Sequence, residues 1–265
     1  MGGFKLEYNH KFKKKFSQNF LQDKSIIDKI ANSIDVSEND IIIEIGPGAG
    51  YLTKELITKT RVLAYEIDKD LEETLNRIKN NNLEIVWDDF LKRDIKTDLS
   101  KYTYDNAYVI ANLPYYITTP IITKIINSGV QFNGIVVMVQ KEVADRFSSL
   151  PGCREYGSIT VFLNYYFKIT KLFNVSRNSF YPKPNVDSAV IYLKNKKTEG
   201  LKVSEEKLFK LVNDCFRYKR KTIKNNLQEY DLEKISTILV ENGYSLSSRA
   251  EQIPLEMFIK IANII

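Results

Sequence analysis

The run NLPY, residues 112–115, combines two carbonyl-type acceptors with an aromatic ring. The side-chain oxygen of Asn112 and the backbone carbonyl of Leu113 can accept both N–H bonds of an exocyclic amine such as that of adenine. Such a nitrogen is a poor nucleophile because it is conjugated with its ring, and two preorganised acceptors favour a pyramidal nitrogen with an available lone pair. Pro114 stiffens the loop, and Tyr115 offers a face for stacking a base, worth about 1–3 kcal/mol. An ordinary turn is the alternative, because Asn and Pro are common turn residues.

A glycine-rich run, residues 46–50, joins a predicted strand to a predicted helix. Glycines let the backbone turn sharply and approach a ligand closely, and the following helix presents unpaired N–H groups to an anion. The spacing is G-x-G-x-G, which differs from the G-x-G-x-x-G of dinucleotide-binding proteins. Gly46, Gly48 and Gly50 are therefore candidate cofactor-binding residues, although a turn without a ligand shows the same pattern.

Two acids follow successive predicted strands. Glu66 stands 20 residues after Gly46, where an acid in doubly wound folds accepts hydrogen bonds from ribose hydroxyls. Asp89 follows the next strand, where it can meet the exocyclic amine of an adenine. Each acid alone is more often a solvated loop carboxylate, but together they favour an adenosine-containing cofactor.

Strands that alternate with helices must position these residues. Helical spacing of apolar residues predicts helices at 25–34, 52–58, 71–79 and 119–127, and β-branched runs predict strands at 41–45, 61–67, 83–87, 108–111 and 134–140. Alternation of this kind implies βαβ units, a parallel sheet and right-handed crossovers. Ligands of open α/β sheets bind at the carboxyl ends of the strands, which is where the glycine loop and NLPY fall.

The pattern changes towards the C-terminus. Two more strand-like runs, 159–166 and 188–193, precede a polar stretch at 194–204, and every later periodic segment is helical. We therefore expect a first domain over residues 1–198 and a small all-helical domain over residues 199–265.

Composition excludes several classes of protein. The chain has 265 residues, a net charge of +6 and one histidine, His10, which excludes histidine triads and multi-histidine metal centres. The two cysteines, Cys153 and Cys215, form no C-x-x-C pair, which favours a reducing, cytoplasmic location over a disulfide framework. The longest apolar run is far too short to span a bilayer.

Several motifs together resemble a known family. EIGPGAGYLT (44–53) and NLPYYITTP (112–120) are similar to S-adenosylmethionine-dependent methyltransferases that act on adenine amines. More narrowly, nearly the whole chain resembles ribosomal RNA adenine dimethyltransferases of the KsgA type. The further matches, in order, are SQNFL (17–21, with Ser17 where the family has Gly), QKEVADR (140–146), EYGSITVF (155–162), FYPKPNVDSAV (180–190) and RYKRKTIKNNL (217–227).

The resemblance implies a fold and an activity. The fold would be a Rossmann-like α/β methyltransferase domain with a mostly parallel seven-stranded sheet, followed by a helical RNA-binding domain. The family dimethylates the N6 amines of two adjacent adenosines in the 3′-terminal hairpin of 16S ribosomal RNA during late small-subunit assembly. Its cofactor is S-adenosylmethionine, whose methyl group is already activated, so no imidazole base is needed.

The resemblance also implies the site residues. Glu66 would hold the ribose and Asp89 the adenine amine of the cofactor, with Phe180 as a second aromatic face for the target base. The full cofactor-binding set would be Asn19, Leu21, Gly46, Gly48, Gly50, Glu66, Ile67, Asp89 and Asn112. The catalytic set would be Asn112, Leu113, Pro114, Tyr115 and Phe180.

Basic residues predict the surface that contacts RNA. The run 216–224 carries five basic residues and no acid, as expected for a surface that binds a phosphate backbone, although a solvated helix face shows the same pattern. A basic cluster near the N-terminus makes a two-sided clamp plausible, and the target adenine must leave its stack to reach Tyr115. The predicted RNA-binding residues are Lys14, Lys15, Arg146, Arg217, Lys219, Arg220 and Lys221.

Three alternatives stay open at this point. A macrolide-resistance (Erm) type enzyme would share the cofactor site but methylate 23S ribosomal RNA. A non-catalytic ribosome assembly factor would keep the fold without the reaction, because fold does not fix function. A nicotinamide dehydrogenase is disfavoured by the glycine spacing. We expect a monomer that acts in the cytoplasm on the small ribosomal subunit or its precursor, without a membrane partner.

Overall fold

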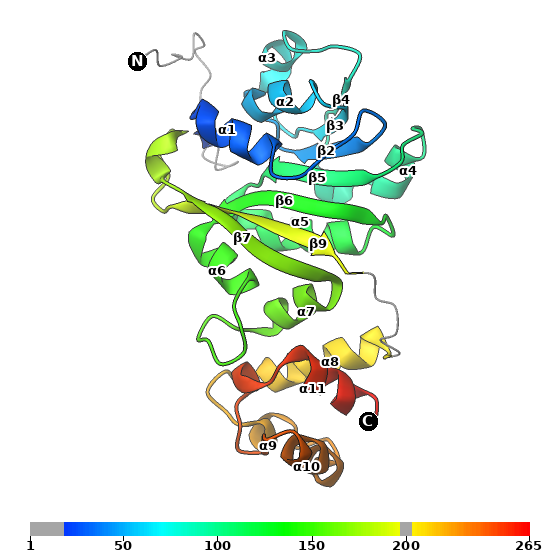
Figure 1. Ribbon diagram of the computed structural model, residues 1–265, viewed down its shortest axis with the longest axis vertical. Helices are drawn as coiled ribbons and strands as arrows, with labels where there is room; N and C mark the ends of the chain where they lie inside the picture. Colours follow the sequence, from blue (N-terminus) through cyan, green and yellow to red (C-terminus); the bar gives the residue numbers. More distant parts are fainter. Residues whose placement is uncertain (1–18, 197–202) are drawn as a thin grey trace. The chain divides into compact units, whose positions relative to one another are not determined.

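The computed structural model describes residues 19–196 and 203–265, and a seven-stranded sheet dominates its first part (Figure 1). The strand order is β4-β3-β2-β5-β6-β9-β7, and a separate two-stranded sheet pairs β1 with β8. The strands are β1 (Phe20–Leu21), β2 (Ile41–Ile45), β3 (Arg61–Tyr65), β4 (Leu83–Val86), β5 (Ala107–Asn112), β6 (Phe132–Gln140), β7 (Phe167–Val175), β8 (Phe180–Tyr181) and β9 (Ser188–Asn195).

Helices α1 to α7 lie between these strands in the sequence, and α8 to α11 follow the last strand. The helices are α1 (Lys24–Ala31), α2 (Tyr51–Leu56), α3 (Glu72–Asn76), α4 (Ile95–Leu99), α5 (Thr118–Ile126), α6 (Lys141–Phe147), α7 (Ser158–Tyr166), α8 (Glu205–Phe216), α9 (Ile223–Asn226), α10 (Leu232–Glu241) and α11 (Leu255–Ala262).

The pairing of the strands confirms the predicted mostly parallel, seven-stranded sheet. β2 pairs in parallel with β3 and β5, β3 with β4, and β5 with β6. β6 and β9 are antiparallel. Parallel strands β2, β3, β4 and β5 bring their carboxyl ends to one edge, so the loops that follow them lie close together.

The sheet is buried on both faces. Ile42, Val62, Ile110 and Val136 belong to one hydrophobic cluster with apolar residues of α1 and α2. Residues in the alternate register, such as Ile43, are equally buried. Parallel sheets with helices on both faces show this burial, and it explains why the strands appear in the sequence as continuous apolar runs.

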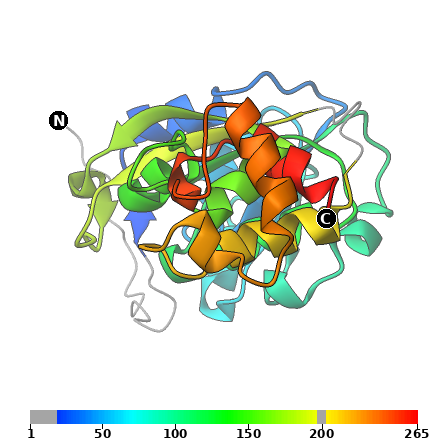
Figure 2. The same cartoon turned by 90° about the horizontal axis from the view of Figure 1, so that it is seen from below.

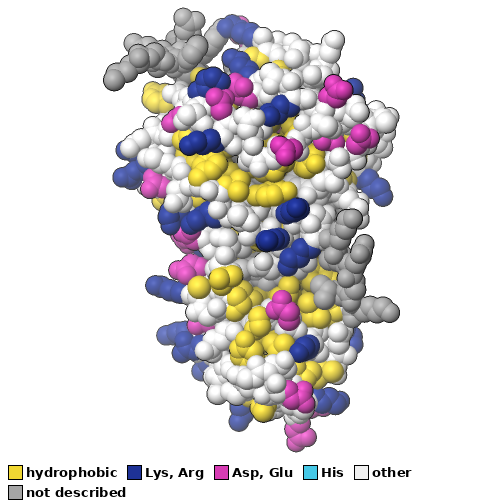
Figure 3. All heavy atoms as spheres, in the orientation of Figure 1, with side chains coloured by type: hydrophobic (Ala, Val, Ile, Leu, Met, Phe, Trp, Pro, Cys, Tyr) yellow, Lys and Arg dark blue, Asp and Glu magenta, His cyan; other side chains and the backbone are white. Residues whose placement is uncertain are grey.

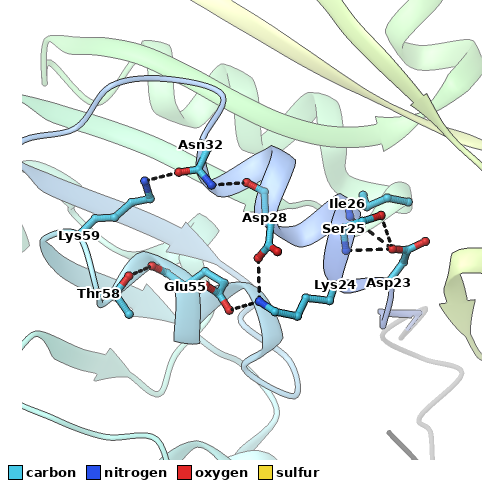
Figure 4. A network of polar contacts seen from close by, with 9 residues as sticks. All are labelled: Asp23, Lys24, Ser25, Ile26, Asp28, Asn32, Glu55, Thr58 and Lys59. Atoms are coloured by element: carbon cyan, nitrogen blue, oxygen red, sulfur yellow. Dashed lines mark hydrogen bonds and ion pairs between the residues drawn. The ribbon is translucent and has the colours of Figure 1, made fainter. Parts of the chain in front are cut away.

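Helix α1 is fixed to its surroundings at its N-terminal end (Figure 4). The Asp23 carboxylate accepts hydrogen bonds from the backbone N–H groups of Ser25, at 3.0 Å, and Ile26, at 3.4 Å, and so caps the helix. Lys24 reaches Glu55 of α2 at 3.1 Å. These contacts fix the helix that directly follows β1.

Two sequence predictions of secondary structure are wrong. The run 159–166, expected as a strand, lies in helix α7, where the Thr160 hydroxyl accepts a hydrogen bond from Gly157 N at 3.2 Å. Strand β7, which follows at once, has no counterpart in the prediction. The other predicted strands and long helices are present, with ends shifted by a few residues.

The chain divides into two compact units. Of the described residues, the first takes 19–144 and 170–194, and the second takes 145–169, 195–196 and 203–265. The predicted boundary at residue 198 lies outside the described residues. The structure corrects the prediction in one respect: segment 145–169, which was expected in the first domain, packs with the C-terminal helices because Val161 and Tyr165 enter the core of the second unit.

The second unit is built from helices around its own core. Helices α8, α10 and α11 lie side by side in Figure 2 (yellow, orange and red), and Leu208, Ile235, Leu239 and Phe258 are fully buried among them. The predicted all-helical character of residues 203–265 is confirmed. Among the described helices, none has the length and apolar character that crossing a membrane requires.

Candidate active site

The loops after β2, β3, β4 and β5, together with β1, enclose a cavity of about 240 Å³ in the first unit. Its position at the carboxyl ends of the parallel strands is where open α/β sheets bind ligands. Most of the predicted site residues are brought together there: Asn19, Leu21, Gly46, Gly48, Glu66, Ile67, Asp89, Asn112, Leu113, Pro114 and Tyr115 all line the cavity.

The glycine loop takes a backbone path that side chains would obstruct. Gly46, Gly48 and Gly50 have φ values of 70°, 58° and 77°, in the left-handed region that favours glycine. A Cβ atom on Gly48 would stand 2.7 Å from the Phe20 ring, and one on Gly50 would stand 2.5 Å from Ile78. Gly50 does not line the cavity and serves the turn into α2, and its contact with the cofactor stays a prediction.

The Glu66 carboxylate is held in place by the backbone. Its Oε2 accepts a hydrogen bond from Gly48 N at 3.1 Å, and its Oε1 accepts one from Asp68 N at 2.8 Å. The side chain is only 5% exposed, and this burial raises the pKa of Glu66 above its ordinary value. Each oxygen retains a second lone pair, which suits the two hydroxyls of a ribose.

Glu44 is a site residue that the sequence analysis missed. It is the penultimate residue of β2, fully buried at the cavity wall. Within the described residues its Oε2 and the neighbouring Thr53 hydroxyl make no hydrogen bond of regular geometry, although this hydroxyl lies close enough to the carboxyl group to lower its pKa. Burial, with a smaller contribution from the negative charge of Glu66, raises the pKa of Glu44 to about 8.

The carboxyl groups of Glu44 and Asp89 indicate whether the cavity can hold a cationic adenosyl compound. An orphaned buried carboxyl oxygen at the cavity wall suits a positively charged ligand. Asp89 Oδ1 caps a short turn by accepting from Leu91 N at 3.0 Å, which orients this half-buried carboxylate at the cavity. The residues present therefore fit the predicted cofactor.

The NLPY loop is fixed along its length. Leu113 N donates to Met138 O of β6 at 3.1 Å. The Thr118 hydroxyl donates to the carbonyl of Pro114 at 3.2 Å. Asn112 Nδ2 donates to Asn19 O at 3.5 Å, which leaves the side-chain oxygen of Asn112 as an acceptor at the cavity. The predicted acceptor is thus present on a loop that is already ordered.

Phe180 does not take the predicted place. It lies in β8 opposite Leu21 of β1, is only 5% exposed, and belongs to the hydrophobic core of the first unit. It is absent from the cavity wall. Strand pairing and core packing occupy this residue, so the described structure does not place it at the cavity, and its role as a second aromatic face stays a prediction. Tyr116, which the sequence analysis did not select, lines the cavity and is 54% exposed.

The predicted RNA-binding residues differ in their exposure and in their contacts with other groups of the protein. Lys14 and Lys15 lie outside the described residues, and Arg146 is exposed on α6. Arg217 pairs with Asp214 at 2.5 Å, and Lys219 donates to Arg154 O at 3.0 Å.

The remaining two basic residues, Arg220 and Lys221, are exposed. In Figure 3, Lys and Arg side chains are scattered over the face shown with Asp and Glu among them, so that face carries no continuous basic field.

Comparisons with known proteins agree with this geometry. A family model described as "Ribosomal RNA adenine dimethylase" matches residues 9–265. "Ribosomal RNA small subunit methyltransferase A" of Mycoplasma mobile is 42% identical, over 94% of this chain and 96% of that protein. The protein of the same name from Lactococcus lactis is 39% identical, over 97% and 90%.

Two solved structures extend the likeness to three dimensions. A dimethyladenosine transferase from Plasmodium falciparum has a TM-score of 0.73 at 28% identity, covering 89% of this chain and 94% of that one. The 23S rRNA methyltransferase ErmE has a TM-score of 0.72 at 25% identity, covering 92% and 99%. The chain therefore belongs to the ribosomal RNA adenine dimethylase family.

Proposed function

We propose that this protein dimethylates the N6 amines of two adjacent adenosines in the 3′-terminal hairpin of 16S ribosomal RNA, with S-adenosylmethionine as methyl donor. Support for the small-subunit substrate comes from full-length relatives named as small-subunit methyltransferases. The monomeric state, the cytoplasmic location and the timing in late subunit assembly stay predictions from the sequence.

The observation that carries the proposal is the carboxamide of Asn112 at the cavity wall. Its nitrogen is engaged with Asn19, so its oxygen can accept one N–H of the target amine. The Leu113 carbonyl would accept the other. These two dipoles favour the positive charge that develops on the attacking nitrogen, and they need no reorganisation because the loop is fixed.

The cofactor, when bound, supplies a methyl group on a positively charged sulfur, so the protein's task is alignment. Glu66 would hold the ribose hydroxyls, and Asp89 would hold the adenine amine. Glu44 would face the cationic part of the molecule. Tyr115 would stack on the target base after it has left the RNA helix.

Replacing Asn112 by Ala tests the proposed chemistry. We expect methyl transfer to fall by about 10²–10³-fold, as for other preorganised dipoles, with RNA affinity nearly unchanged. Single-turnover transfer of labelled methyl groups and filter binding of the RNA measure the two effects. Asn133→Ala, which removes a surface amide hydrogen bond to Asn106, is the matched control. Near-normal turnover of the Asn112→Ala variant would refute the role of this residue.

The substrate is tested by offering two RNAs to the parent protein. We expect dimethyladenosine in small-subunit precursor particles and none in naked large-subunit RNA, read by mass analysis of the nucleosides. Methylation confined to the large-subunit RNA would replace the small-subunit assignment by the Erm-type alternative.

A further inference from the structure

The hydroxyl groups of Tyr115 and Ser188 meet at the back of the active site. Their oxygen atoms are 2.6 Å apart, although the residues are 73 positions apart in the chain. This separation is typical of a well-formed O–H···O hydrogen bond. Tyr115 lines the cavity, whereas Ser188 does not, so the bond holds the far end of a ring whose remaining surface faces the ligand site.

Ser188 is a rigid anchor for this bond. It is the first residue of β9, is 0% exposed, and pairs with Gln140 of β6. The preceding residue, Asp187, accepts a hydrogen bond from Lys141 N through its carbonyl and from Arg177 N through its carboxylate, both at 2.9 Å. Because the backbone is fixed on both sides, the position of the Ser188 hydroxyl is set by the sheet.

Tyr115 is fixed at its backbone by separate contacts. The Thr118 hydroxyl lies within hydrogen-bonding distance of the carbonyls of Pro114, at 3.2 Å, and Tyr115, at 3.4 Å. The remaining freedom is rotation of the Tyr115 side chain about its two bonds, and a hydrogen bond at the hydroxyl fixes the first of them, because it holds the far end of the ring in one place. Burial raises the pKa of Tyr115 above its ordinary value, so the hydroxyl stays protonated and can donate to Ser188.

We propose that Ser188 is a positioning residue, which holds the far end of the Tyr115 ring so that the ring stays at the place where it stacks on the target adenine. The inference rests on the proposed function and adds a residue outside the cavity wall to the machinery. A platform that is ordered before the base arrives does not lose side-chain freedom on binding, so both affinity and alignment improve.

A double-mutant cycle tests the proposal. Ser188→Ala and Tyr115→Phe each remove the same hydrogen bond and leave both the backbone and the aromatic ring in place. We expect the substitution in each single variant to lower kcat/KM for the RNA by about 3–10-fold. The kcat/KM of the double variant should be no lower than that of the less active single variant. Ser188→Thr keeps the hydroxyl and should restore most of the activity.

Two readouts separate positioning from a merely structural role. The affinity for S-adenosylmethionine, measured by calorimetry, should stay within about twofold of the parent value in all four variants. The hydrogen bond that they change, at the Tyr115 hydroxyl, lies away from the proposed contacts of this cofactor. An RNA with 2-aminopurine in place of a target adenosine should show less stacking-dependent quenching in Ser188→Ala than in the parent protein.

The matched control is Ser128→Ala, which removes a hydroxyl that donates to the carbonyl of Ile125 at 2.7 Å and accepts from Val130 N at 3.2 Å, just after α5. It should lower Tm without changing kcat/KM or quenching. Parental kcat/KM in Ser188→Ala, or full additivity of the two single variants, would overturn the proposal. A parent protein that methylates no adenosine would instead refute the proposed function, so the two failures are distinguishable.

Discussion

At the scale of single residues, Glu44 makes the stability of the fold depend on pH. Burial raises its pKa from an ordinary 4.5 to about 8, so between these values the folded chain holds a proton that the unfolded chain releases. The stabilisation is fully present below the unfolded pKa and is lost as pH rises through the folded pKa. Glu44→Gln removes this titration, and its free energy of unfolding should therefore fall less steeply from pH 5 to pH 8.

Urea unfolding of both proteins at several pH values measures the difference in slope, which is at most about 1.4 kcal/mol per pH unit. Glu229→Gln, at an exposed position, is the control and should follow the parent curve. If the Glu44→Gln and parent curves run parallel across this range, Glu44 does not carry the excess proton.

The sequence predicted most of the residues that line the cavity. It did not predict their hydrogen-bond partners or their degree of burial. Asn112, Tyr115, Glu66 and Asp89 were identifiable because short motifs follow successive strands, and parallel strands end at one edge. The roles of Ser188 and Glu44 were not, because a partner 73 residues away and the complete burial of a carboxyl group depend on how the strands pair.

At the scale of elements, the N-cap of α1 lies next in sequence to a segment that lines the cavity. Asp23 caps the helix and directly follows the segment that carries Asn19 and Leu21 into the cavity. Asp23→Ala should lower the free energy of unfolding by about 1 kcal/mol, and the looser segment should weaken donor binding. Urea unfolding and calorimetry measure the two effects.

Asp28→Ala is the control for this helix, because it removes only an exposed contact with Lys24 and should cost well under about 1 kcal/mol. Unchanged stability of Asp23→Ala would show that the cap is redundant with the other contacts of α1 in Figure 4.

The wrong assignment of α7 has a physical cause. Its sequence, SITVFLNYY, is rich in β-branched and aromatic residues, which favour strands when propensity alone decides. The helix wins because Val161, Leu163 and Tyr165 are buried by tertiary packing, which local propensity does not contain. Strand β7 was missed for the opposite reason: it carries Lys168 and Lys171 among its apolar residues, as an edge strand does.

At the scale of the whole molecule, the sequence predicted two parts but not which segments compose them. A linear boundary follows from a change in composition, whereas the second unit recruits segment 145–169 from before the last strands of the sheet. Only burial of Val161 and Tyr165 in the helical core reveals this. In the same unit, the residues of the basic run differ in their contacts. Arg217 forms an ion pair with Asp214, whose Oδ2 also accepts a hydrogen bond from Tyr230.

Among the predicted RNA-binding residues of the second unit, Arg220 and Lys221 give the cleanest test. Arg220 and Lys221 are exposed, whereas removing Arg217 would also disturb the network around Asp214. The double variant Arg220→Ala, Lys221→Ala should weaken RNA binding for all sequences alike and reduce the slope of log affinity against log salt by about 2, one for each lost phosphate contact. Filter binding at four or more salt concentrations measures this slope.

The control is the double variant Lys54→Ala, Lys79→Ala, which removes the same charge from exposed positions of the first unit. It separates an effect of position from an effect of total charge. A long-range effect of net charge would change both double variants equally, because each loses two positive charges. Direct phosphate contacts would lower the slope only for Arg220 and Lys221. A slope equal to that of the parent protein would mean that these two side chains face solvent in the complex, and RNA binding would then have to be assigned to other basic residues.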